Sequence, residues 1–169
     1  IFLYQADLVP VGEDQRQHIE LTRDLGQRFN NRYSEVFNIP QAQIIKALAK
    51  INDLQDPNSK MSKSAASMSG VIELLDSSDV ILKKFKSSVT DAGKEIKYEE
   101  KSKPGISNLL TIHSAFSGKS ITEVENEFAD KGYGDFKTAV AEVVNAELAP
   151  IREKTATLME DPAELMRIL

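Results

Sequence analysis

The sequence contains no cysteine, which excludes disulfides and thiolate metal sites and is compatible with a reducing compartment. It has two histidines, which are too few for a histidine-rich metal site. No apolar run approaches the roughly 18 residues that a membrane span needs. Basic residues are not in excess either: the net charge is −5, which argues against a general nucleic-acid binder but is compatible with a local RNA-binding face.

The rest of the composition is that of an ordinary globular protein, with 41% hydrophobic and 28% charged residues. A length of 169 residues suffices for one domain with a real core, or for one domain and part of another. The chain opens with Ile1–Tyr4 and no initiator methionine, and this opening is too short and too uncharged for a signal peptide. We therefore expect a fragment or a partly represented protein.

The stretch Lys60–Ser64 reads Lys-Met-Ser-Lys-Ser and lies between turn formers at Asp56–Ser59 and small residues at Ala65–Ser67. No apolar periodicity runs through it, which predicts an exposed, mobile loop. Lys60 and Lys63 are three positions apart, so their ammonium groups can approach one polyanion, and the serines add hydroxyl groups. The residues alone fit either a phosphate-contacting loop or a plain solvated loop.

The N-terminal stretch predicts a short strand followed by a helix. Asp7–Gly12 reads as a strand that ends at a glycine, and Pro10 restricts it to an edge or a terminal position. Glu13 and Asp14 favour a helix N-terminus. The expected inward face of this helix consists of Ile19, Thr22, Leu25 and Phe29. This order is typical of α/β ligand sites, although a plain turn with an acidic cap fits equally well.

The second half of the chain reads as a series of helices. Apolar spacing predicts one at residues 79–89, with its inward face made of Val80, Leu82, Phe85 and Val89. Further helices are predicted from Pro104 to a stop at Gly118, from a capping box that begins at Ser120, after Tyr133-Gly134, and from Asp161 onward. Pro150 is expected to kink or split the long one.

Two smaller features have simple interpretations. His113 lies on an apolar stripe without a catalytic or metal-ligating partner nearby, which favours a packed or surface histidine. Lys83, Lys84 and Lys86 read as a solvated helix face, with contact to RNA phosphates as the alternative.

The pentapeptide Lys60–Ser64 matches the second signature of class I aminoacyl-tRNA synthetases. The run Val9–Asp24, which begins Val-Pro-Val-Gly-Glu-Asp-Gln and ends Glu-Leu-Thr-Arg-Asp, resembles the segment of bacterial tryptophanyl-tRNA synthetases that closes the active site. Gly12 lies 48 residues before Lys60, and this separation also fits that family. The resemblance extends over essentially all 169 residues.

The resemblance implies an α-rich α/β fold. Residues 1–65 would be the last strand–helix part of a Rossmann-like catalytic domain with its KMSKS loop. Residues 66–169 would be an all-α, anticodon-side domain that is incomplete at its C-terminus. Lys103–Leu110 and Lys131–Lys137 are similar to segments of that helical domain.

The implied activity is that of a tryptophan–tRNA ligase. The tryptophan carboxylate attacks the α-phosphate of ATP, which carries Mg²⁺, and the adenylate then esterifies tRNA(Trp). No protein nucleophile and no protein metal site are needed, so catalysis is positioning and charge stabilisation. The family further implies a cytoplasmic enzyme that is a homodimer at full length, without a membrane partner.

The resemblance assigns roles to individual residues. Lys60 and Lys63 would be catalytic, because they would neutralise the β- and γ-phosphates and the departing pyrophosphate. The implied ATP-binding residues are Gly12, Glu13, Asp14, Ile51, Lys60, Met61, Ser62, Lys63 and Ser64. The implied tryptophan-binding residues are Val9, Val11 and Gln15. Without the resemblance, Ile51 is an ordinary core residue.

Two family features are missing from the chain. The first class I signature, His-Ile-Gly-His, is absent, since His18 is followed by Ile-Glu and His113 by Ser. The aspartate that recognises the indole N–H in the family would directly precede Ile1. We therefore expect the isolated 169-residue chain to be inactive. The rival readings are a tyrosyl-type synthetase, a non-enzymatic helical module that binds tRNA or a protein, and a plain α-rich domain.

Overall fold

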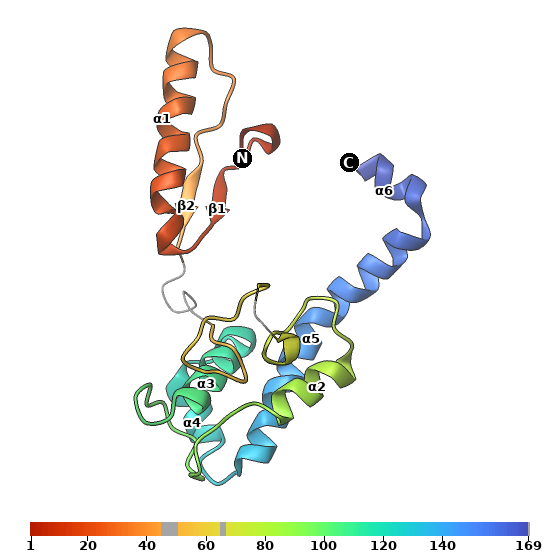
Figure 1. Ribbon diagram of the computed structural model, residues 1–169. Helices are drawn as coiled ribbons and strands as arrows, with labels where there is room; N and C mark the ends of the chain where they lie inside the picture. The colour runs from red at the N-terminus through yellow and green to blue at the C-terminus, as the bar shows by residue number, and fades with distance from the viewer. Residues whose placement is uncertain (45–50, 65–66, 169) are drawn as a thin grey trace. The chain divides into compact units, whose positions relative to one another are not determined.

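A computed structural model describes residues 1–44, 51–64 and 67–168 of the chain (Figure 1). The chain divides into two compact units, Ile1–Ala49 and Lys50–Leu169. The lysine-serine loop Lys60–Ser64 belongs to the second unit. The domain boundary predicted between residues 65 and 66 falls outside the described residues and stays a prediction.

The first unit contains a two-stranded parallel sheet and one long helix (Figure 1). Its elements are the 3₁₀ turn η1 (Phe2–Tyr4), strand β1 (Leu8–Pro10), the 3₁₀ turn η2 (Glu13–Gln15), helix α1 (Arg16–Arg32) and strand β2 (Gln41–Gln43). Strand β1 pairs with β2 in parallel, and Val9 lies opposite Ala42. The predicted strand and helix are thus confirmed, with Pro10 as the last residue of its strand.

The packed face of α1 differs from the predicted one. Ile19 is buried as expected, but Leu25 is 54% exposed and Phe29 is 37% exposed. Phe29 still packs its ring on that of Phe37, with 4.9 Å between the centroids. The other residues that pack or bond toward the rest of the unit are Ile19, Arg23, Gly26 and Asn30, which repeat at helical spacing.

Polar bonds and a glycine explain this shift. The Arg23 guanidinium donates to the Pro40 carbonyl (2.6 Å), and the Asn30 amide donates to the Phe37 carbonyl (2.8 Å). At Gly26 the rings and methyl groups of other segments come so close that an added Cβ would lie 3.0 Å from them. An apolar-periodicity argument cannot find a face that is made of an arginine, a glycine and an asparagine.

The second unit is a helical assembly (Figure 1). A cluster of buried apolar side chains forms its core. Its elements are the 3₁₀ turn η4 (Met68–Gly70) and helices α2 (Ser78–Lys86), α3 (Pro104–Ser117), α4 (Ile121–Glu127), α5 (Tyr133–Glu160) and α6 (Pro162–Ile168). Helices α2 and α3 both pack on α5, and α4 packs on α3. Phe85 of α2, Leu109 of α3 and Phe136 of α5 are each at most 1% exposed. This core holds the segment that carries the loop, because Leu54, Ile51 and Met61 pack against it.

Local signals predicted most helix ends in this unit. Helix α3 has Pro104 at its start and ends at Gly118, whose φ is +71°. The capping box at Ser120 is present, and the Glu164 N–H donates to the Asp161 carboxylate (3.1 Å) at the start of α6. Helix α5 runs through Pro150, so the expected split was wrong, whereas the alternative of a kink stays a prediction. Pro150 is exposed, so water can reach the carbonyl that its missing N–H leaves free.

The inward face of α2 was predicted in part, because Phe85 is buried and Leu82 packs against the core as expected. Ile81 and Phe85 are the buried residues, whereas Val80 is 39% and Val89 is 46% exposed. The Ser77 hydroxyl caps the helix and Ile81 packs inward, which turns Val80 toward solvent. No helix among the described residues is long and apolar enough to cross a bilayer.

Candidate functional site

The base of the Lys60–Ser64 loop is a short antiparallel pairing, in which Asn52 lies opposite Lys60. Two backbone hydrogen bonds flank this pair, from Met61 N to Ile51 O (3.0 Å) and from Asp53 N to Ser59 O (2.9 Å). The loop therefore leaves the second unit from a hydrogen-bonded hairpin base rather than from an unstructured connection.

The turn of this hairpin is organised by a buried carboxylate. Asp53 is 7% exposed, and its Oδ1 accepts from the N–H groups of Gln55 (2.7 Å) and Asp56 (3.2 Å). Gly70 lies against this carboxylate, and a Cβ on Gly70 would be 1.6 Å from Asp53 Oδ1. The Leu54 N–H donates to the Gly70 carbonyl (2.9 Å), which ties the turn to the segment after the loop.

The loop presents both of its lysines to solvent. Lys60, Lys63 and Ser64 are exposed, whereas Met61 and Ser62 are half-buried. Met61 packs against the core of the second unit, and the Ser62 and Ser64 hydroxyls are hydrogen-bonded to each other (2.9 Å). Within the described residues neither lysine is in an ion pair. This arrangement leaves two ammonium groups available to a polyanion.

The first unit carries the other predicted site residues at the C-terminal end of β1. Val9 and Val11 are half-buried, and the Val11 N–H donates to the Gln43 carbonyl (3.1 Å), which extends the pairing with β2. Gly12 follows directly and caps η2. The C-terminal edge of a parallel sheet, continued by a helix start, is where α/β folds place their ligands.

The acidic and amide side chains of η2 make polar contacts with neighbouring side chains. Glu13 is paired with Arg16 (2.6 Å), and Gln15 donates to the Asp14 carboxylate (3.2 Å). The side-chain oxygen Oε1 of Gln15 is also hydrogen-bonded to His18 Nδ1 (2.7 Å). Glu13, Asp14 and Gln15 are all exposed, so they are accessible to a ligand in this unit.

The predicted site residues therefore form two groups. One group, Val9, Val11 and Gly12–Gln15, lies within the first unit, and the other, Ile51 and Lys60–Ser64, lies within the second. Each group is gathered by its own unit.

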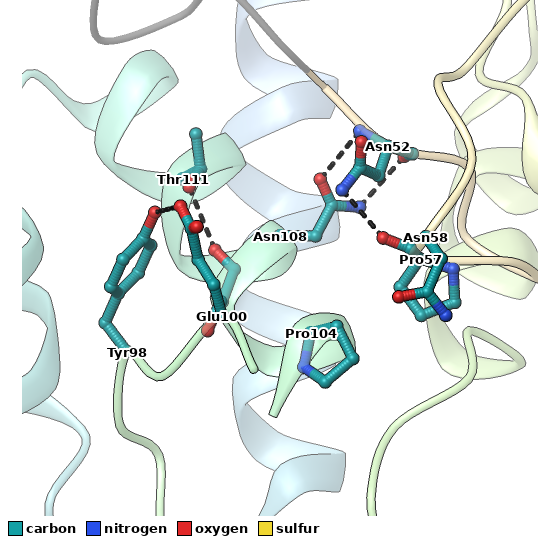
Figure 2. A pocket seen from close by; sticks show the side chains of 9 residues that line it. Asn52, Pro57, Asn58, Tyr98, Glu100, Pro104, Asn108 and Thr111 are labelled. Atoms are coloured by element: carbon teal, nitrogen blue, oxygen red, sulfur yellow. Dashed lines mark hydrogen bonds between the residues drawn. The ribbon is translucent and has the colours of Figure 1, made fainter. Parts of the chain in front are cut away.

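Sequence reasoning missed one residue that contacts the loop base. Asn108 of α3 is 6% exposed, and its side-chain amide bonds both backbone groups of Asn52 at 2.9 Å (Figure 2). A signal was present, because an asparagine flanked by Ile106 and Leu109 on a helix is a buried polar group that needs partners. What it bonds could not be read from the sequence.

A cavity of about 220 Å³ opens between the loop base and α3 (Figure 2). Its lining is mostly polar, with contributions from Asn52, Asn58, Glu100 and Thr111. Asn52 Oδ1 is buried there without a hydrogen-bond partner among the described residues. Among the residues that the structure describes, no group of three histidine, cysteine or acidic side chains could hold a metal ion.

Comparison with known proteins identifies the family. The family model described as "tRNA synthetases class I (W and Y)" matches residues 1–149. The chain is 56% identical over 169 residues to the tryptophan–tRNA ligase of Leifsonia xyli subsp. xyli, covering all of this chain and 50% of that protein. It is 54% identical over 154 residues to that of Listeria monocytogenes serotype 4b, covering 91% and 46%. The chain thus spans about half the length of the curated relatives it matches.

Solved structures of tryptophanyl-tRNA synthetases are also similar to this chain. The tryptophanyl-tRNA synthetase of Mycoplasma pneumoniae matches with a TM-score of 0.70 and 38% identity, covering 93% of this chain and 49% of that one. The enzyme of Campylobacter jejuni complexed with ADP and tryptophan matches with a TM-score of 0.62 and 32% identity, covering 100% and 51%. The tyrosyl-tRNA synthetase of Aeropyrum pernix matches with 0.56 and 26%, covering 96% and 47%.

These matches confirm the predicted fold class, a Rossmann-like strand–helix part followed by a helical part. The small parallel sheet with α1 corresponds to the first part, and α2 to α6 correspond to the second. Because the family model covers residues 1–149, the chain belongs to the class I tRNA synthetases of the tryptophan and tyrosine group.

Proposed function

We propose that the chain is part of a tryptophan–tRNA ligase, which activates tryptophan with ATP and transfers it to tRNA(Trp). The observation that carries this proposal is the 56% identity, over all 169 residues, to a tryptophan–tRNA ligase. The tyrosyl-tRNA synthetase from Aeropyrum pernix is 26% identical, compared with 38% for the tryptophanyl enzyme from Mycoplasma pneumoniae. Tryptophan is therefore the better supported amino-acid substrate.

The exposed lysines of the loop supply the charge that this reaction needs. Attack of the tryptophan carboxylate on the α-phosphate leaves negative charge on the departing pyrophosphate. Lys60 and Lys63, on a loop whose base is fixed to the second unit, neutralise that charge. Ser62 and Ser64 supply hydroxyl donors, and Met61 anchors the loop through its contact with the core.

The remaining substrate contacts come from the edge of β1 and from the residue before the loop base. Gly12, Glu13 and Asp14 bind the ribose side of ATP, where carboxylates accept hydrogen bonds from hydroxyl groups. Val9 and Val11 line the indole pocket, with Gln15 reaching the amino acid. Ile51 contacts the adenine.

The wider assignments belong to the same proposal. Residues 1–65 form the end of the catalytic domain and residues 66–169 the anticodon-side domain. Mg²⁺ enters bound to ATP, and ADP together with tryptophan is bound in the Campylobacter jejuni structure. The whole protein acts in the cytoplasm as a homodimer.

The test is amino-acid-dependent ATP–pyrophosphate exchange by the whole polypeptide that contains these residues. Exchange that depends on tryptophan and not on tyrosine is the expected result. Exchange with tyrosine alone would move the protein to the tyrosyl group. No exchange with either amino acid would contradict the proposal and would favour a helical module that binds tRNA or a protein.

The same pyrophosphate exchange assay applies to the 169-residue chain by itself. It contains no His-Ile-Gly-His signature among its 169 residues. We expect no tryptophan-dependent exchange from it, and robust exchange would show that this signature is dispensable.

A further inference from the structure

The pairing of Asn52 with Lys60 leaves the backbone of Asn52 turned away from the loop. The hydrogen bonds of the hairpin base come from the residues on either side of Asn52, so Asn52 and Lys60 are a non-hydrogen-bonded pair. In such a pair the N–H and C=O of each residue point outward. Those of Asn52 point to α3, which lies beside the hairpin base (Figure 2).

Asn108 satisfies both of these groups with one side chain. Its Oδ1 accepts from the Asn52 N–H at 2.9 Å, and its Nδ2 donates to the Asn52 carbonyl at 2.9 Å. A carboxamide presents one donor and one acceptor side by side, which is what a neighbouring strand residue would present. The side chain therefore replaces a third strand at the loop base.

The position of Asn108 is fixed by the core. Its neighbours Ile106, Leu109 and Leu110 are each at most 1% exposed, and α3 packs on α5. The loop base is thus bonded to a deeply buried turn of α3. Removing the amide would leave two backbone groups of Asn52 without partners in a partly buried place.

We propose that Asn108 is the positioning residue of the lysine-serine loop. It bonds the backbone of Asn52, and Asn52 is paired with Lys60. This pairing fixes the backbone from which the side chains of Lys60 and Lys63 extend toward the phosphates. The role rests on the proposed function, since it is exercised only when the loop acts on a nucleotide. A positional error of about 1 Å in such a group costs roughly 100-fold in rate.

The test uses the whole polypeptide that contains these residues and measures tryptophan-dependent pyrophosphate exchange. Asn108→Ala is expected to lower kcat/KM for ATP by about 10- to 100-fold while leaving the KM for tryptophan within about twofold. The matched control is Asn126→Ala, because Asn126 is an exposed asparagine of α4 in the same unit. It should retain the wild-type kcat/KM for ATP.

A double-mutant cycle with Lys63→Ala separates positioning from general structural damage. If Asn108 acts through the loop, Asn108→Ala should cost less than about threefold once Lys63 is absent. Equal losses in both backgrounds, or parallel losses in the tryptophan and ATP constants, would overturn the positioning role.

Asn108→Asp keeps the proposal testable if the alanine variant does not fold. An ionised carboxylate accepts from the Asn52 N–H but repels the Asn52 carbonyl, whereas the protonated acid restores both bonds. The pKa of an aspartate is ordinarily about 3.9, and burial beside a carbonyl raises it, so the activity relative to wild type should rise as the pH falls from 7 to 5. A flat ratio would contradict the role.

The two proposals fail in distinguishable ways. Wild-type exchange with tryptophan, together with an unaffected Asn108→Ala variant, would remove the positioning role alone. Absence of wild-type exchange would remove the proposed function and this role with it.

Discussion

The two units of the chain bury their apolar side chains very differently. In the second unit, α2, α3, α4 and α5 all contribute to one core, in which Ile106, Val124 and Phe136 are 0% exposed. In the described part of the first unit, Ile19 is the buried apolar side chain of α1, whereas Leu21 and Leu25 are more than half exposed. The first unit is held by a small cluster of rings, in which Phe37 packs on Phe2 and Phe29. Side chain–backbone bonds, such as Arg23 to Pro40 and Asn30 to Phe37, add to it.

The difference teaches which group of candidate site residues stands on a well-buried core. Hydrophobic burial contributes most of the free energy of folding, whereas one hydrogen bond adds on the order of 1 kcal/mol net. The loop that carries Lys60 and Lys63 is fastened to the well-buried unit through Leu54, Met61 and Asn108. The substrate contacts expected at the end of β1 stand on the sparsely buried one.

The largest effect expected from this comparison is a core truncation. Phe136→Ala in the second unit should lower the free energy of unfolding by about 3–5 kcal/mol, because it removes a fully buried ring. Leu25→Ala in the first unit should cost about 0.5 kcal/mol or less, since that side chain is already 54% exposed. Urea unfolding followed by circular dichroism measures both. Equal losses would show that the two units are stabilised alike.

A smaller effect is expected where the loop base meets the chain that follows it. Gly70→Ala would place a Cβ 1.6 Å from the Asp53 carboxylate and should cost about 1–3 kcal/mol. Gly134→Ala is the matched control, because no atom lies within 4 Å of its added Cβ and it lies inside α5. That variant should gain about 0.5–1 kcal/mol from helix propensity. Thermal unfolding that fails to separate the two would contradict the close packing at Gly70.

The smallest effect is a pH dependence that belongs to the second unit. His113 is 3% exposed, and its ring lies against Phe128 and Phe136. Burial lowers the pKa of His113. The charge of Glu127 raises this pKa, and the charge of Lys119 lowers it. The unfolded chain therefore takes up a proton more readily than the folded chain, so this contribution to stability is present above pH 6.5 and is lost below it.

The melting temperature should accordingly fall between pH 7 and pH 5.5, and the fall should be shallower in His113→Gln. His18→Gln is the control, since His18 is exposed on α1, and it should retain the wild-type slope. A wild-type slope in His113→Gln would assign the pH dependence to other groups.

Chain-local chemistry is what the sequence predicted well. Pro104, Gly118 and the Ser120–Glu123 capping box mark helix ends because each acts on backbone groups within a few residues. The loop was recognisable for the same reason, since a polar lysine-serine run without apolar periodicity favours a loop over a helix or strand.

Features that depend on distant partners were missed or misplaced. The packed face of α1 runs through Arg23 and Gly26 because Pro40 and Ile39 return beside it, and no periodicity in α1 encodes that return. Asn108 bonds a residue 56 positions away, so its role appears only when the fold brings α3 to the loop base. The same limit explains why Val80, rather than Ile81, was expected in the core.

The most direct test of the central claim, that the exposed loop lysines act on the phosphates of ATP, is the exchange rate of Lys63→Ala. Lys83→Ala is the matched control, because Lys83 is an exposed lysine of α2 in the same unit. In the whole polypeptide, Lys63→Ala should lower tryptophan-dependent pyrophosphate exchange by about 100- to 1,000-fold, while Lys83→Ala leaves it unchanged. An unchanged rate in Lys63→Ala would contradict the claim and leave the loop as a solvated connection.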